Sequence, residues 1–257
     1  MKKSLSYSLI TIPFIFLALP SYSLNNPLND ETTLKMIVAG KYDKKNKSIV
    51  HRLSQTITKK FEMLNNEEYK TSIVLNKSFT ENGKLKQIIV TQSKDKTSEC
   101  HGCAPIVGIS TLTKTNNNWS VENKIDYIAR IGTWGKTPKP KLLEIGKDNY
   151  GLIFEEGYTG MGMTTTRTYI TAKINDKYKP VLTVDNTYTD NAGICGEETK
   201  QLCYKYDSTY KFVKDNQKFY PIVFTYKGTD TDGNEKVISA NKTIKYIFSK
   251  DQYILQK

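Results

Sequence analysis

The stretch at 164–188 reads TTTRTYITAKINDKYKPVLTVDNTY and consists of two runs, Thr164–Ile174 and Tyr178–Tyr188, on either side of Asn175-Asp176. Both runs are rich in the β-branched and aromatic residues that fit the pleated surface of a strand. Asn and Asp tolerate the positive φ angles that tight hairpin turns require. The stretch therefore predicts two long antiparallel strands joined by a short turn.

The same alternation of strand-like runs and turn-forming residues extends from Glu68 to the C-terminus. The expected strands are Thr71–Thr80, Leu85–Gln92, Ile106–Lys114, Trp119–Ile131, Leu142–Ile145, Tyr150–Glu155, Thr164–Ile174, Tyr178–Tyr188, Cys203–Lys214, Lys218–Lys227, Lys236–Ile238, Thr243–Phe248 and Gln252–Leu255. Their irregular spacing favours successive hairpins over a strict repeat array. We expect a mainly β fold, an antiparallel meander arranged as a barrel, a sandwich or a propeller-like assembly.

Two helical patterns precede the strands. Asp30 is the expected N-cap of a helix near 30–39, and Ser48 is the expected N-cap of a longer helix near 48–65. Apolar residues of the second pattern recur at three- and four-residue steps, namely Val50, Leu53, Ile57, Phe61 and Leu64. This periodicity is typical of the buried face of a helix. The sequence thus predicts an N-terminal pair of helices packed on the β-rich domain.

Residues 1–23 have the three parts of a secretory signal peptide. A positively charged start precedes an apolar run at Leu9–Leu19, and Ser21-Tyr22-Ser23 places small residues at the cleavage position. The apolar run is too short to cross a hydrocarbon core of about 30 Å. We expect cleavage before Leu24, which would leave residues 24–257 as a single β-rich domain, periplasmic or secreted, without a transmembrane segment.

The chain is basic, with 38 Lys+Arg against 26 Asp+Glu and a formal net charge of +12. In a cytosolic protein this excess would indicate nucleic acid, but an exported chain meets acidic polysaccharides, lipid head groups or other proteins. We therefore expect no nucleic-acid partner. The residues proposed to contact an anionic envelope component are Lys41, Lys44, Lys45, Lys47 and Arg52. The alternative is a solvated helix face plus a loop.

Four cysteines in an exported chain predict disulfide bonds. Of the three pairings we favour Cys100–Cys103 with Cys195–Cys203, because both close short loops. The run Cys-His-Gly-Cys at 100–103 has two other interpretations, a redox-active pair and a copper(I) or zinc site with His101 as a ligand. The apolar residues that follow indicate a strand rather than a helix N-terminus, which favours a structural disulfide and no cofactor.

The sequence contains no H-E-x-x-H, phosphate-binding loop, G-x-S-x-G elbow or dinucleotide-binding fingerprint. Four aromatic residues near expected loops are candidates for a carbohydrate platform, namely Trp134, Tyr150, Tyr158 and Tyr188. Ordinary packing in the core or on strand edges is the alternative for each of them. The composition therefore directs attention to binding surfaces rather than to a known catalytic motif.

These features predict a soluble, exported, non-enzymatic protein that binds a partner or an envelope component, for example as an inhibitor or an immunity-type module. The alternative is a thiol–disulfide or soft-metal-handling protein that acts through Cys100, His101 and Cys103. A third class, the carbohydrate-active enzymes, requires two carboxylates that face each other across a cleft, which a sequence does not show.

Overall fold

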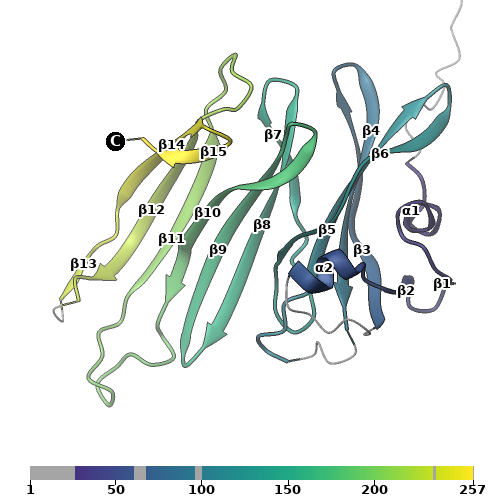
Figure 1. The fold of residues 1–257 in the computed structure, drawn as a ribbon. Coiled ribbons are helices and arrows are strands. Elements are labelled where there is room, and N and C mark those ends of the chain that lie inside the picture. Colours follow the sequence, from purple (N-terminus) through teal and green to yellow (C-terminus); the bar gives the residue numbers. More distant parts are fainter. Residues whose placement is uncertain (1–26, 61–67, 96–99, 234–235, 257) are drawn as a thin grey trace, which may run out of the picture.

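The computed structural model describes residues 27–60, 68–95, 100–233 and 236–256. The expected signal peptide at 1–23 and the last part of the predicted helix at 48–65 lie outside these residues. Antiparallel strands dominate the described chain, so the prediction of a mainly β fold is confirmed (Figure 1). Within the described ranges, no helix has both the length and the apolar character needed to span a bilayer.

The first six strands form one sheet in the order of the sequence. They are β1 (Tyr42–Asp43), β2 (Ser48–Arg52), β3 (Glu68–Glu81), β4 (Lys84–Lys94), β5 (Ile106–Thr115) and β6 (Asn118–Arg130). Each strand is antiparallel to the next. Asn82 and Gly83, in the turn between β3 and β4, have φ angles of 51° and 71°. These residues thus form the tight turn that the Asn-Gly pair predicts.

The remaining strands form a second, nine-stranded sheet. They are β7 (Lys141–Gly146), β8 (Asn149–Gly160), β9 (Met163–Ile174), β10 (Lys177–Asp190), β11 (Lys205–Phe212), β12 (Ile222–Thr231), β13 (Val237–Ser239), β14 (Lys242–Ser249) and β15 (Gln252–Leu255). Their order is β15-β14-β12-β11-β10-β9-β8-β7, with β13 paired to β12. The predicted hairpin at 164–188 is formed by β9 and β10, with Lys173 opposite Tyr178 and both turn residues at positive φ.

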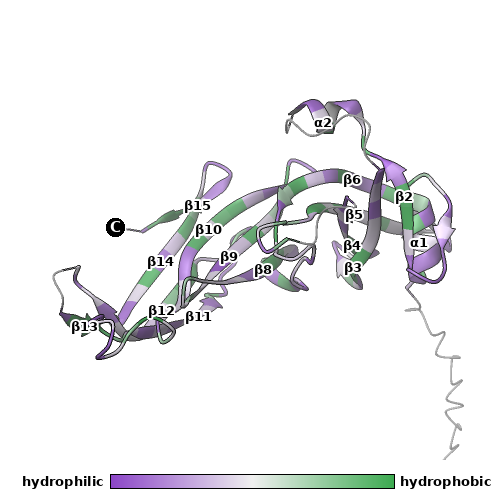
Figure 2. Ribbon diagram, turned by 90° about the horizontal axis from the view of Figure 1, so that it is seen from below, coloured by the Kyte–Doolittle hydropathy of each residue, from purple (hydrophilic) through white to green (hydrophobic). Residues whose placement is uncertain are grey.

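The two sheets lie side by side in an elongated molecule and share a hydrophobic core (Figures 1 and 2). Leu152 and Phe154 of β8 pack against residues of the six-stranded sheet such as Val90 and Val107. Ile153 faces the opposite side of β8 and belongs to a second core cluster inside the nine-stranded sheet. Because successive side chains of a strand point to opposite faces, β8 is buried on both.

Helix α1 (Asp30–Ile37) covers the outer face of the six-stranded sheet. Leu34 and Ile37 pack on Ile49 and Ile89, whereas the neighbours of Ile89 along β4 face the nine-stranded sheet. The helix lies where it was predicted but is shorter, and its N-cap is Asn29, whose side chain accepts a hydrogen bond from the backbone N–H of Thr32. The prediction of Asp30 as N-cap is therefore wrong by one residue.

The predicted helix at 48–65 is wrong in its first part, because residues Ser48–Arg52 form strand β2. Ile49 is fully buried and the next residue, Val50, is 45% exposed, which is the alternation of a strand. Pairing with β3 along the whole of β2 satisfies the backbone hydrogen-bonding groups that a helix would otherwise satisfy. A short helix, α2 (Gln55–Lys60), follows.

Candidate binding site at the disulfide-bearing end

The structure contains the disulfide bonds Cys100–Cys103 and Cys195–Cys203, the local pairing expected from the sequence. The first bond closes a turn in which the N–H of Cys103 donates to the carbonyl of Cys100 over 3.0 Å. Strand β5 begins shortly afterwards at Ile106. A strand therefore follows this pair, as the apolar run after Cys103 predicted.

Both disulfide-closed loops lie against the β8–β9 hairpin, although they are far apart in the sequence. The ring of His101 stacks on Tyr158 of β8 with centroids 4.7 Å apart. Next to the second loop, the N–H of Gly193 donates to the carbonyl of Gly162 in the hairpin turn over 3.0 Å. A Cβ on Gly193 would lie 2.6 Å from that oxygen, so the contact requires glycine. The turn end of the β8–β9 hairpin, at the lower end of the molecule in Figure 1, thus contacts both segments that carry the disulfide bonds.

Three rings at this end form what we call the aromatic cluster: His101, Trp134 and Tyr158. The His101 centroid is 5.3 Å from that of Trp134 and 4.7 Å from that of Tyr158. Trp134 is 56% exposed and Tyr158 is 47% exposed. Large aromatic side chains that remain half exposed in one place are typical of interaction surfaces.

A tight turn holds Trp134 in this exposed position. Its φ angle is 52°, in the left-handed region that non-glycine residues rarely adopt. Thr133 and Lys136 exchange backbone hydrogen bonds across the turn, and the N–H of Gly135 donates to the carbonyl of Cys103 over 2.8 Å. The disulfide-closed loop therefore anchors the turn that presents the indole ring.

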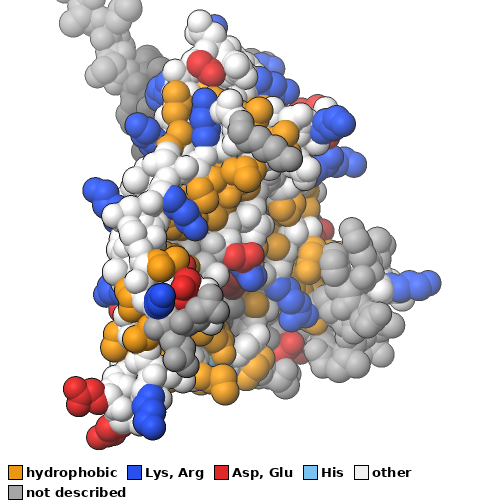
Figure 3. All heavy atoms as spheres, turned by 90° about the vertical axis from the view of Figure 1, so that its left-hand side faces the viewer, with side chains coloured by type: hydrophobic (Ala, Val, Ile, Leu, Met, Phe, Trp, Pro, Cys, Tyr) orange, Lys and Arg blue, Asp and Glu red, His pale blue; other side chains and the backbone are white. Residues whose placement is uncertain are grey.

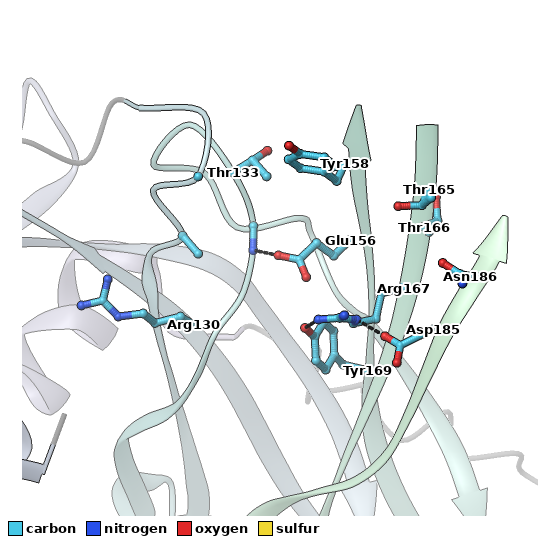
Figure 4. A pocket seen from close by; sticks show the side chains of 13 residues that line it. Arg130, Thr133, Glu156, Tyr158, Thr165, Thr166, Arg167, Tyr169, Asp185 and Asn186 are labelled. Carbon is cyan, nitrogen blue, oxygen red and sulfur yellow. Dashed lines mark hydrogen bonds and ion pairs between the residues drawn. The ribbon is translucent and has the colours of Figure 1, made fainter. Parts of the chain in front are cut away.

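Beside the aromatic cluster lie two adjoining pockets of about 400 and 380 Å³, which we call the seam groove. The two pockets share Gly132, Thr133 and Glu156. The polar side chains around them come from both sheets and from the connection between them. Those of the first pocket include Arg130, Thr133, Glu156, Thr165, Thr166, Arg167, Tyr169, Asp185 and Asn186 (Figure 4), and the second adds Lys136 and Thr137. The groove thus lies where the two sheets meet.

An irregularity in β10 places two of these side chains. Val184 pairs with Thr168 and Tyr188 pairs with Thr166, so three residues of β10 lie opposite a single residue of β9. Asn186, within this bulge, has a φ angle of 52°. The extra residues let Asp185 and Asn186 face the groove. Bulges of this kind are frequent beside functional sites because they redirect side chains.

Two groups of hydrogen bonds hold polar side chains of the groove (Figure 4). Asp185 forms an ion pair with Arg167, which also donates to the hydroxyl of Tyr169 over 2.9 Å. On the other side of the groove, the N–H of Gly132 donates to Glu156 Oε1 over 2.5 Å. The hydrogen bond to Tyr169 and the Asp185 carboxylate raise the pKa of Arg167, and burial raises the pKa of Tyr169. These side chains are therefore oriented before any ligand arrives.

The groove also contains cations without an acidic partner. Among the described residues, neither Arg130 nor Lys136 forms an ion pair, and both are exposed. The Arg167 charge is compensated by Asp185, whereas Glu156 accepts a hydrogen bond from the neutral backbone N–H of Gly132. The groove consequently carries an excess of positive charge.

Of the four aromatic residues considered for a carbohydrate platform, the structure brings two together. Trp134 and Tyr158 belong to the aromatic cluster, joined by His101. Tyr150 packs on Phe79 next to the core between the sheets, and Tyr188 donates a hydrogen bond to Asp190. Ordinary packing and hydrogen bonding therefore account for Tyr150 and Tyr188.

The basic residues proposed to contact an anionic surface lie elsewhere. Lys44, Lys45 and Lys47 are exposed in the turn between β1 and β2, with Lys41 before β1 and Arg52 at the end of β2. They occupy the free edge of the six-stranded sheet, so the expectation that part of this segment forms a solvated helix face is wrong. Lysine on an edge strand also hinders pairing with other chains. On the opposite side of the molecule, shown in Figure 3, Lys and Arg side chains are spread among hydrophobic and acidic ones.

The side chains of Cys100, His101 and Cys103 are engaged in other contacts in this structure. The two sulfur atoms are bonded to each other, and the imidazole contacts the rings of Trp134 and Tyr158. Within the described ranges, no three His, Cys, Asp or Glu side chains are grouped so that they could hold a metal ion.

The sequence did not point to Arg130, Arg167 or Tyr169. The local sequence signal for this site is an i, i+2 spacing. It places Arg167 and Tyr169 on one face of their strand, and Glu156 and Tyr158 on one face of theirs. No family model, curated protein sequence or solved structure matches this chain. The function must therefore be inferred from the geometry of the site.

Proposed function

We propose that the protein is an exported, non-enzymatic binding protein whose ligand packs on the aromatic cluster and enters the seam groove. The observation that carries this proposal is the convergence of three segments, distant in the sequence, on two half-exposed rings, Trp134 and Tyr158, beside a groove. Trp, Tyr and Arg are the residues that most often dominate binding energy at protein surfaces.

The rigidity of the site supports a binding role. The Cys100–Cys103 bond and the backbone hydrogen bonds of the 133–136 turn hold the cluster. Asp185 and Tyr169 hold Arg167, and the N–H of Gly132 holds Glu156. A surface that is already ordered loses less conformational entropy when the ligand binds. The two carboxylates of the groove, Glu156 and Asp185, act as hydrogen-bond acceptors that fix neighbouring groups, which suits recognition better than proton transfer.

The charge of the chain supports an anionic ligand in the cell envelope or outside the cell. The net charge of +12 falls to +10 when cleavage of the expected signal peptide removes Lys2 and Lys3, and this charge raises the local concentration of anionic partners through the long-range field. The unpaired cations of the groove act on the same ligand at short range. Attraction of this kind weakens with ionic strength, because the Debye length is about 8 Å at physiological salt.

The experiment is co-sedimentation of the purified protein with isolated cell envelopes of the producing organism. The variant Trp134→Ala/Tyr158→Ala removes both exposed rings, and we expect at least a tenfold weaker retention, because truncating two central aromatic anchors costs about 1–2 kcal/mol each. The matched control is Val237→Ala/Ile238→Ala on β13, where two apolar residues are 45% and 44% exposed.

Urea unfolding midpoints identical to that of the wild type show that both variants are folded. Undiminished retention of the Trp134/Tyr158 variant would contradict the proposal, as would an equal loss in the β13 control. Chemical breakdown of a retained envelope component by the wild-type protein would contradict its non-enzymatic part.

A further inference from the structure

We infer that the ligand of the seam groove is an anionic carbohydrate, whose ring stacks on the aromatic cluster and whose acidic group pairs with Arg130. This inference rests on the proposed function and specifies the chemical class of the ligand. It follows from three properties of the same surface: flat exposed rings, a groove lined by mixed donors and acceptors, and unpaired positive charge.

The first property is the aromatic cluster. A sugar ring has apolar C–H faces and a polar rim of hydroxyl groups, so it requires a flat apolar surface with hydrogen-bonding groups beside it. Trp134 and Tyr158 remain about half exposed and lie next to the groove, Trp134 at one of its two pockets and Tyr158 at the other. Aromatic rings also have an electron-rich face that attracts the slightly positive hydrogens of C–H groups.

The second property is the polar lining of the groove. Thr133, Thr165 and Thr166 contribute hydroxyl groups and Asn186 contributes an amide, all of which can both donate and accept hydrogen bonds. Each sugar hydroxyl likewise donates once and accepts twice, so this lining matches a polyhydroxylated ligand. A stable protein partner would instead bury about 1,200–2,000 Å² around an apolar centre. The centre of this site is polar and concave, which favours the carbohydrate.

The third property is the charge of the groove. Arg130 lines the same pocket as Arg167, its side chain extends away from Arg167 in Figure 4, and it forms no ion pair with any described residue. A guanidinium group binds a carboxylate through two parallel hydrogen bonds, which gives it both strength and orientation. A sugar that carries a carboxylate would satisfy Arg130 while its ring covers the neighbouring aromatic cluster. Neutral sugars would leave the guanidinium exposed.

The fluorescence of Trp134 provides a direct measurement. The chain has two tryptophans, and Trp119 packs against the core cluster beneath α1. The variant Trp119→Phe therefore makes Trp134 the sole tryptophan. We would titrate it with oligogalacturonate and hyaluronan fragments as acidic probes, and with dextran and cello-oligosaccharides as neutral probes.

We expect a saturable change in Trp134 emission with an acidic probe, and at least tenfold weaker binding of the neutral probes. Arg130→Gln should lower the affinity for the acidic probe to that for the neutral ones. The matched control is Lys139→Gln, which removes an exposed cation from the same connection between the sheets but outside the seam groove. This control should bind the acidic probe like the Trp119→Phe parent.

Three outcomes would overturn the inference. Equal losses in Arg130→Gln and Lys139→Gln would mean that the probes respond to overall charge, and equal binding of neutral and acidic probes would remove the role of Arg130. If no carbohydrate changes the emission of Trp134 while envelopes still retain the protein through Trp134 and Tyr158, the inference fails and the proposed function stands. Loss of that envelope retention would refute the proposed function itself.

Discussion

Replacement of Glu81 by glutamine tests a buried ionic contact that links the two sheets. Glu81, at the end of β3, accepts hydrogen bonds from Lys86 of β4 and from Lys173 of β9, both at 2.6 Å. Lys86 also contacts Glu122 of β6 at 2.7 Å. The side chains of Glu81 and Lys86 are each 6% exposed. The variant would therefore leave two nearly buried ammonium groups with one carboxylate.

The expected loss of stability follows from this burial. Removing one partner of a buried ion pair costs about 3–5 kcal/mol, because the remaining charge has neither water nor a counter-charge. Glu81→Gln should lie at the lower end, about 3 kcal/mol, since Lys86 keeps Glu122 and Lys173 is 16% exposed. Lys173→Met should cost less, because it leaves the pair between Glu81 and Lys86 intact.

The effect should also depend on pH. Burial disfavours the ionised form of Glu81, but the hydrogen bonds from Lys173 and Lys86 outweigh it and lower the pKa of Glu81 from its usual 4.5. A pKa that is lower in the folded state adds stability above the unfolded-state value, and this stability is lost as the pH falls through the lowered pKa. The difference between wild type and Glu81→Gln should therefore be constant near neutral pH and shrink below about pH 4.

The assay is urea unfolding of the oxidised protein at 25 °C, with free energies compared at a common denaturant slope. The control is Asp251→Asn, which removes a surface pair with Lys179 whose side chains are 55% and 48% exposed. Exposed pairs contribute at most about 1 kcal/mol, and asparagine suits the φ angle of 68° at this position. The reasoning is refuted if Glu81→Gln costs no more than Asp251→Asn, or if its cost does not decline in acid.

Three further outcomes are expected. The Cys100–Cys103 bond should have a reduction potential below about −200 mV in a glutathione series read by alkylation mass spectrometry, and a higher potential would favour the redox alternative. The reduced protein should bind copper(I) or zinc no more tightly than its His101→Ala variant does, and tighter binding would favour the metal alternative. Charge reversal of the three lysines in the 44–47 turn should weaken adsorption to vesicles of anionic lipid at low salt, and unchanged adsorption would leave them as edge protection only. Exported protein should begin at Leu24, whereas an intact mass that includes residues 1–23 would contradict the signal peptide.

The strands and the disulfide pairs could be predicted because both depend on neighbouring residues. The hairpin of β9 and β10 follows from a period of two in each run and from Asn175-Asp176, which adopt the positive φ angles of the turn. Cys100–Cys103 and Cys195–Cys203 close loops so short that their ends are seldom far apart. In each case the deciding geometry extends over a few residues of chain.

The region 48–65 shows where local pattern fails. Val50, Leu53 and Ile57 have helical spacing, yet Ser48–Arg52 pairs along its length with β3. A strand becomes stable only when a partner strand supplies its hydrogen bonds, and a spacing rule applied to one segment does not include that partner. The prediction of a helix failed because the hydrogen bonds that stabilise β2 as a strand come from β3, which lies outside the segment 48–65.

The candidate site depends on tertiary structure to a still greater degree. His101, Trp134 and Tyr158 belong to three separate segments, and no spacing within any of them indicates that their rings meet. Their contact arises because the first disulfide-closed loop lies against both the β8–β9 hairpin and the 133–136 turn of the connection between the sheets. The β10 bulge then adds Asp185, opposite Arg167. Strand register and sheet order, which are set by hydrogen bonds between distant segments, decide which side chains share this surface.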